Sequence, residues 1–135
     1  MEDKIVLPIY WTQEFKTKPD KTVLAGMNFY RNAHYHAQNS MKKDFHELVA
    51  NQLPNDPDTY DGSFRLELGI YYKNANCDGA NIAAIIEKFV LDSLQSMNVV
   101  INDNVKYHKG TTWKVLGQDK DDPRCEVTLV KEDTI

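Results

Sequence analysis

The sequence predicts an α+β domain, in which a small mixed or antiparallel sheet carries two main helices packed on it. Two stretches repeat apolar residues at helical spacing, and several others alternate apolar and polar residues as strands do. The order of these stretches is β, α, β, α, β, β, which is typical of helices packed on one sheet. A length of 135 residues fits one domain, so we expect a single domain over residues 1–135.

The first half of the chain predicts one strand, one loop and one helix. Residues 5–11 are apolar and predict a strand, and Pro8 within it indicates an edge position or a bulge. Residues 13–32 are polar and show no period, so we expect a loop. A helix is expected over residues 35–53 and is ended by Pro54, because its apolar residues have helical spacing: Met41, Phe45, Leu48, Val49 and Leu53.

The second half predicts three strands around the most regular helix. Residues 64–72 alternate apolar and polar side chains, which predicts a half-buried strand. Residues 79–97 carry a long apolar stripe and predict an amphipathic helix. Two further strands are expected over 104–116 and 124–131, with a turn of aspartates and proline at 119–123.

Composition excludes several classes of protein. With 41% hydrophobic and 27% charged residues the chain is typical of soluble globular proteins, and no apolar run is long enough for a membrane helix. Its start, Met1 to Lys4, lacks the pattern of a secretory leader. Only two cysteines, Cys77 and Cys125, are present, which excludes a disulfide scaffold and a cysteine-based zinc site. We therefore expect a cytoplasmic protein.

The acidic residues are concentrated in the middle of the chain. The net charge of −4 argues, taken globally, against a nucleic-acid-binding protein. Residues 54–103 hold eight acidic residues against three basic ones. A carboxylate cluster that binds a divalent cation would produce this pattern, and so would a plain acidic loop containing Asp56, Asp58 and Asp61.

One group of polar residues could form a catalytic site. At 100° per residue, Asn81, Lys88 and Asp92 fall within about 40° of one another on the helix. Asp78 precedes this helix and Asp103 follows it, so both could converge with the stripe on one site. Carboxylates suit Mg²⁺, which could polarise a phosphodiester, while a lysine could stabilise the negative charge that develops.

Each of these residues also has a simpler interpretation. Lys88 and Asp92 are four residues apart and could be an ordinary surface pair on a helix. Asp78 could serve only as the N-cap of the helix, and Asp103 could be only a turn residue.

Three short runs around this helix resemble a known family. The segments 77–82 (CDGANI), 88–94 (KFVLDSL) and 101–105 (INDNV) are similar to the core of RusA-type Holliday junction resolvases. The resemblance is specific over residues 77–105 and is one of layout only in the N-terminal part. It implies a magnesium-dependent endodeoxyribonuclease of phage or prophage type that acts on branched DNA in the bacterial cytoplasm, and it implies a homodimer. A two-fold symmetric pair of sites would match the two equivalent strands of a four-way junction.

The resemblance assigns roles to individual residues. Asp78 matches the first metal-binding aspartate of the family, Asp103 the last, and Lys88 the catalytic lysine. Asn81 and Asp92 match recurrent positions whose role is less defined.

The chain departs from the family pattern at three points. The second metal-binding aspartate falls on Ala80, and the residue before Asp103 is Asn102 where the family has an aspartate. The stretch from Asn81 to Lys88 is also about one helical turn longer, which keeps the lysine on nearly the same face. We expect Asp92 to supply the missing carboxylate, because it lies on the polar stripe, and Glu87 is the alternative.

Several basic residues are candidates for DNA contacts, and each could also be merely a solvated surface charge or a lysine that protects a strand edge. They lie before the second strand and after Asp103: Arg31, Lys42, Lys43, Lys106 and Lys109. The histidines His34, His36 and His46 do not share one face of a helix, so they do not indicate a zinc site.

The sequence therefore predicts an endonuclease that resolves Holliday junctions, with Asp78, Asp103 and Asp92 as magnesium ligands and Lys88 beside them. Ala80 and Asn102 favour an alternative, a junction-binding accessory protein of the same fold without catalysis. The acidic net charge favours a third, an interaction module that does not bind DNA.

Overall fold

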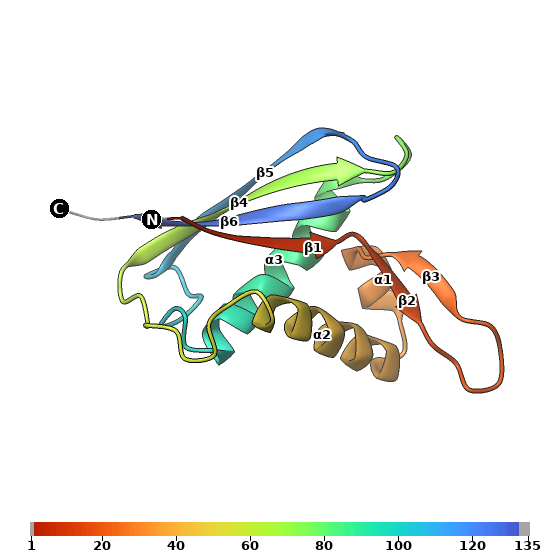
Figure 1. Ribbon diagram of the computed structural model, residues 1–135, viewed down its shortest axis with the longest axis horizontal. Coiled ribbons are helices and arrows are strands. Elements are labelled where there is room, and N and C mark those ends of the chain that lie inside the picture. The colour runs from red at the N-terminus through yellow and green to blue at the C-terminus, as the bar shows by residue number, and fades with distance from the viewer. Residues whose placement is uncertain (1, 133–135) are drawn as a thin grey trace.

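A four-stranded sheet with helices on one face forms the frame of the protein, and a small hairpin projects from one end (Figure 1). The structure is a computed structural model that describes residues 2–132, with side chains from residue 4 onward. The sheet order is β1-β6-β4-β5, formed by β1 (Glu2–Pro8), β6 (Arg124–Glu132), β4 (Ser63–Tyr72) and β5 (His108–Gln118). β6 is antiparallel to β1 and β4, whereas β4 and β5 are parallel, so the predicted α+β class with a mixed sheet is confirmed.

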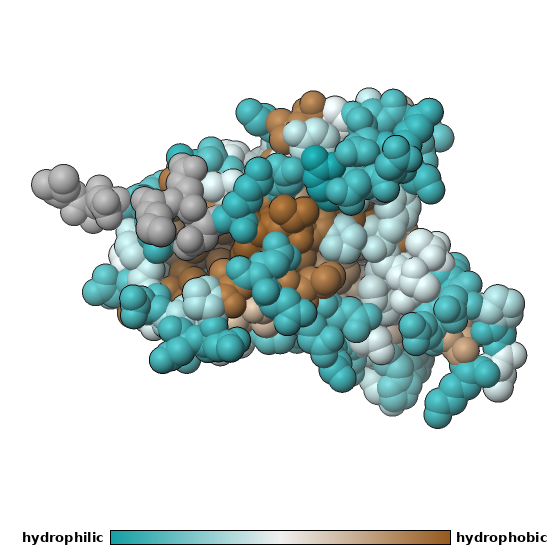
Figure 2. Space-filling model, in the orientation of Figure 1, coloured by the Kyte–Doolittle hydropathy of each residue, from teal (hydrophilic) through white to brown (hydrophobic). Residues whose placement is uncertain are grey.

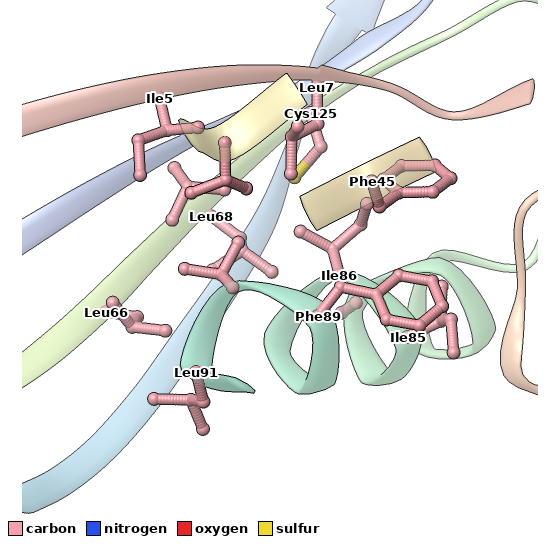
Figure 3. Packing of buried hydrophobic residues seen from close by; sticks show 14 of the residues in the cluster. Ile5, Leu7, Phe45, Leu66, Leu68, Ile85, Ile86, Phe89, Leu91 and Cys125 are labelled. Atoms are coloured by element: carbon pink, nitrogen blue, oxygen red, sulfur yellow. The ribbon is translucent and has the colours of Figure 1, made fainter. Parts of the chain in front are cut away.

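The parallel pair requires a crossover, and α3 (Gly79–Ser96) provides it between β4 and β5. Its buried stripe includes Ile82, Ile85, Ile86 and Phe89, as the helical spacing predicted. They belong to one buried cluster with the inward row of the sheet, and Figure 3 shows Ile86 and Phe89 of this cluster beside Phe45. The N-terminus of α3 therefore lies near the end of β4, and its C-terminus lies near the start.

The second main helix, α2 (Tyr35–Ala50), packs against α3. Phe45 of α2 stacks on Phe89 of α3 with ring centroids 5.1 Å apart. Burying two such rings in a dry contact contributes on the order of 1 kcal/mol beyond the area removed from water. The helix ends at Ala50 rather than at residue 53, because Asn51–Leu53 continue only as turns.

The strand expected over residues 5–11 is divided in two. β1 pairs with β6 up to Pro8, and the chain then bends at Ile9 and continues as β2 (Tyr10–Gln13) in a separate two-stranded sheet. Pro8 ends an edge strand, as predicted, because its missing N–H is tolerated there.

The prediction of a loop over residues 13–32 is wrong for the second half of that range. β3 (Lys21–Leu24) pairs with β2, and α1 (Met27–Asn32) follows directly. These elements left no signal because they are short, and because the six residues of α1 include no fully buried side chain and no side-chain N-cap. Asp44 of α2 holds the hairpin by accepting a hydrogen bond from the Trp11 indole at 2.8 Å.

The strand expected to begin at residue 104 begins at His108. Asparagine side chains bond to the chain just ahead of themselves: Asn102 Oδ1 accepts from the Asn104 amide at 2.9 Å, and Asn104 Oδ1 accepts from the Lys106 amide at 3.0 Å. Such turns satisfy backbone donors that a strand would otherwise pair. Lys106 therefore lies in a turn, and Lys109 is on the strand.

The two edges of the sheet differ in whether another part of the chain binds their outer backbone. The Gln52 amide binds the outer backbone of β1, accepting from Val6 N and donating to Val6 O, each at 2.8 Å. Figure 2 shows apolar surface between the sheet and α2 beside this contact, and Val6 and Leu48 are its exposed apolar residues. β5 forms the other edge and pairs with β4 alone.

In residues 2–132, no helix combines the length and the apolar character needed to cross a membrane.

Candidate functional site

Lys88 and Asp92 lie side by side on α3, as their spacing predicted. Lys88 Nζ is 3.4 Å from Asp92 Oδ2, and both side chains are a little more than one-third exposed. An exposed pair of this kind contributes about 0.3–0.5 kcal/mol, so the pair is weak as a source of stability. Both charges therefore stay accessible to a ligand in solvent.

Asp78 and Asp103, by contrast, lie at opposite ends of α3. Asp78 is the N-cap, and its Oδ1 accepts a hydrogen bond from the Asn81 amide at 3.3 Å. The 18 residues of α3 then extend the chain by about 27 Å before the loop that contains Asp103. That loop remains at the far end, because Tyr107 O accepts from the amide of Phe64 at the start of β4.

The predicted convergence of the metal ligands is therefore wrong within one chain. Asp92 is 14 residues from Asp78 on the helix, or about 21 Å. The physical reason is the topology: a helix that joins two parallel strands begins at one end of them and finishes at the other. Among the residues that the structure describes, no three His, Cys, Asp or Glu side chains are placed to share a metal ion.

Asn81 has a structural role rather than a ligand-binding one. Its Oδ1 accepts from the amide of Asn28 at 2.7 Å, in the first turn of α1. Its amide group also lies directly against Gly26, where a Cβ atom would collide with it. Asn81 thus fixes the start of α1 on the first turn of α3. Asn81 lies on the helix as predicted, but its side-chain oxygen binds the Asn28 amide instead of a ligand.

The remaining predicted polar residues on these helices line a groove between α2 and α3. The groove has a volume of about 680 Å³, and both helices supply its walls. Three lysines line the groove, Lys42 and Lys43 from α2 and Lys88 from α3. Among the described residues that line it, Asp92 is the only one with a carboxylate. The lysine side chains are long enough to bring their ammonium groups together over this opening.

The bottom of the groove is formed by polar contacts between the helices. His46 Nδ1 is 2.9 Å from Ser93 Oγ, and this serine is 1% exposed. Asn39 and Gln95 add side-chain amides to the two walls. The groove thus offers hydrogen-bond donors and positive charge together, which suits an anion such as a phosphate.

Sequence reasoning missed this groove as a unit. Lys42 and Lys43 were assigned to DNA contacts, whereas Lys88 was assigned to a metal site. No ion pair with a carboxylate is described for Lys42 or Lys43 within residues 4–132, and both are exposed. The apolar pattern contains a signal for this groove, namely Phe45 and Phe89. Because their rings stack, the polar flanks of α2 and α3 lie side by side.

The other basic residues predicted to bind DNA lie elsewhere. Arg31 is exposed at the end of α1. Lys106 lies over the ring of Tyr107, with Nζ 5.2 Å from its centroid, and Lys109 Nζ donates to Val105 O at 3.1 Å. These two lysines belong to the end of the sheet where Asp103 lies, so the predicted DNA contacts form three separate groups.

Three aromatic side chains pack together where α2 begins, with the rings of His34 and His36 stacked and the ring of Tyr35 tilted against both. The rings of His34, Tyr35 and His36 lie with centroids 4.0–5.0 Å apart, and Tyr35 is 59% exposed. His34 is the N-cap of α2, and its Nδ1 accepts a hydrogen bond from the His36 amide at 3.2 Å. An exposed stack of rings offers a flat apolar surface to a ligand base.

No model of a known protein family matches the chain, and no curated protein matches it.

Proposed function

We propose that the protein binds DNA, and branched DNA in particular, through the groove between α2 and α3, without catalysis by the groove itself. The observation that carries this proposal is the convergence of Lys42, Lys43 and Lys88 on one groove with a single carboxylate. Phosphate binding needs local positive charge, and a local excess is compatible with a net charge of −4 for the whole chain.

The aromatic stack at the start of α2 supports a substrate with unpaired bases. Tyr35 lies about two helical turns before Lys42, on the helix that supplies two of the groove lysines. Bases at a branch point are more accessible than those in a continuous duplex, and stacking on an aromatic ring contributes about 1–3 kcal/mol per base. Lysines would hold the backbone while the rings contact the branch.

Magnesium-dependent cleavage of a Holliday junction is the second candidate, and the resemblance over residues 77–105 is the observation that favours it. Within one chain the carboxylates do not fit a shared ion, because α3 separates Asp78 from Asp103. Cleavage through these residues would require two copies, with Asp103 of one reaching Asp78 of the other. The homodimer implied by the resemblance makes this second candidate testable.

The groove is tested by binding of a labelled four-way junction and of a linear duplex of the same sequence, at 50 and 200 mM salt without magnesium. We expect the double variant Lys42→Ala/Lys43→Ala to weaken junction binding about tenfold at low salt and to reduce the slope of log K against log salt by about two. The matched control Lys16→Ala/Lys120→Ala removes two exposed charges away from the helices and should change affinity less than twofold. Equal loss in both double variants, or no junction binding by the wild type, would overturn the proposal.

Adding magnesium to the same mixtures tests cleavage. Symmetric nicking that is lost in Asp78→Asn and in Asp103→Asn supports the second candidate, and Asn at position 78 keeps an N-cap so that the helix is preserved. Nicking that persists in both variants removes these carboxylates from the reaction. A shift without nicking supports binding alone.

A further inference from the structure

The edge strand β5 has an outer backbone that nothing in residues 2–132 pairs with. Its central part, Thr111–Val115, stays in register with Leu66–Ile70 of β4, and irregularities in the pairing flank it on both sides. These irregularities fall at the glycines of β5, Gly110 and Gly117, so five regular residues are left between two bulges. A regular unpaired edge is a template for another strand.

The side chains of this part of β5 are unusually apolar for an exposed edge. Trp113 is 43% exposed and Val115 is 50% exposed. Both lie on the helix side of the sheet, since they pair with the buried Leu68 and Ile70. The equivalent side chains of β1, β4 and β6 are fully covered, so the core layer is incomplete only along β5 within the described sheet.

Two hollows lie between β5 and the first half of α3 on this side, and Trp113 lines one of them. One, of about 250 Å³, is apolar, lies beside Val115 and reaches Cys77 and Ile82. The other, of about 260 Å³, lies between Trp113 and a small-residue face of α3 formed by alanines 80, 83 and 84. Small side chains on the helix leave room for a large side chain from outside.

A second copy of the chain fits this edge by symmetry. Two identical antiparallel strands are related by a two-fold axis perpendicular to the sheet, which keeps each residue on its own face and makes the contact self-complementary. Facing residues then have both odd or both even numbers. With Trp113 opposite Trp113 of the second copy, Lys114 faces Thr112 and Val115 faces Thr111. No lysine faces a lysine in this register, whereas a register centred on Lys114 would oppose two ammonium groups.

We propose that the outer edge of β5 is a homodimer interface, in which Thr111–Val115 pairs antiparallel with the same segment of a second copy about a two-fold axis at Trp113. The sheet then continues across two chains as eight strands. Each tryptophan covers the apolar edge of the other copy, and the alanines of α3 make room for it. This interface follows from β5 itself and does not depend on DNA binding.

The oligomeric state tests the proposal directly. We expect wild-type protein at tens of micromolar to have twice the chain mass of 15.6 kDa in light scattering, and Trp113→Lys to have the mass of one chain. The matched control is Val6→Lys, which places a lysine at a 40% exposed apolar position on the opposite edge and should leave the dimer intact. Circular dichroism of each variant separates dissociation from unfolding.

Hydrogen exchange of the wild type provides a second readout that needs no variant. Backbone amides of residues 111–115 that point outward should exchange at least tenfold more slowly in concentrated than in dilute protein, whereas the amide of Val6 should not change. A monomeric wild type, a Trp113→Lys variant that remains a folded dimer, or dissociation caused by Val6→Lys would each overturn the proposal. A monomer that still binds junctions through Lys42 and Lys43 would leave the proposed function standing.

Discussion

The edge strands β1 and β5 flank the same sheet, yet only β1 is covered. The inward side chains Ile5 and Leu7 of β1 are at most 1% exposed, and Gln52 binds its outer backbone. On β5 the corresponding side chains of Trp113 and Val115 are about half exposed, and the outer backbone is open. The reason is the placement of the helices, because α2 contacts β1 whereas only part of α3 reaches β5.

The difference teaches that position at an edge does not by itself decide how a strand is stabilised. β1 is stabilised within the chain, by burial on one side and by a side-chain amide on the other. Among the described strands β5 pairs with β4 alone, and it keeps apolar surface that a partner can cover. The following predictions test either this contrast between the two edges or the contacts that hold β1 within the chain.

The largest effect is expected from truncating the buried face of β1. Leu7→Ala leaves a cavity at a fully buried position and should reduce the free energy of unfolding by about 2–5 kcal/mol. The same type of truncation at the half-exposed Val115 should cost about 1 kcal/mol or less in the monomeric Trp113→Lys background. Urea unfolding of both variants measures the two values, and equal losses would contradict the contrast between the edges.

A smaller effect is expected from removing the amide that covers the β1 backbone. Gln52 makes three hydrogen bonds, including one from Nε2 to Leu48 O at 2.9 Å, so Gln52→Ala should cost about 1–2 kcal/mol. Water replaces these bonds in the variant, which keeps the loss modest, and hydrogen exchange at Val6 should become faster. Glu47→Ala, an exposed change on the helix α2 that precedes Gln52, serves as the control.

The ion pair between β1 and β6 should make stability depend on acid. Lys4 lies 2.6 Å from Glu126, and this ammonium, with Arg124 adding to it, holds the pKa of the Glu126 carboxyl below its usual value. The unfolded chain therefore binds a proton more readily than the folded one, so this stabilisation is complete above the ordinary glutamate pKa and is lost as pH falls through the folded one. Thermal unfolding from pH 7 down to pH 2 should show a smaller acid destabilisation in Glu126→Gln than in the wild type, with Asp58→Asn as a loop control.

The reactivity of the two thiols should differ as the two edges of the sheet do, and measuring it requires no substitution. Cys125 is a residue of β6 that pairs with Leu7 of β1, and it is fully buried. Burial, with Glu126 contributing, raises the pKa of its thiol to about 12. Cys77 is partly exposed in the hollow beside Val115. Because the thiolate is the reactive form, a disulfide reagent at pH 8 should modify Cys77 in the folded protein and reach Cys125 only on unfolding. Rapid modification of both thiols in the folded state would show that β1 opens easily.

The regular elements of the fold could be predicted, and the short ones could not. The spacing of Ile82, Ile85 and Phe89 predicted α3 almost to the residue, because a buried stripe must repeat as the helix does. β3 and α1 escaped detection, since four and six residues are too few to show a period. The start of β5 was placed too early because side-chain bonds from Asn102 and Asn104 outweigh the apolar pattern there.

The sequence indicated which residues are candidates for a site, but it did not indicate how they lie relative to one another in the fold. Lys88 and Asp92 form the pair that their spacing indicated, because that relation is local to one helix. The relation between Asp78 and Asp103 depends on the direction in which α3 crosses the sheet, and one sequence read segment by segment does not specify it. The helix length was the available clue, because 18 residues span more distance than one cation can bridge.

The fit of Asn81 against Gly26 has a consequence for how the chain tolerates change. The segment around Gly26 shows no hydropathy period. It is nevertheless fixed in place, because Gly26 lies against the side chain of Asn81 on α3. A single methyl group at residue 26 would have to displace that amide and with it the anchorage of Asn28. Sensitivity to substitution in this protein is thus set by close approach between segments, and an irregular stretch can be the least forgiving part of the molecule.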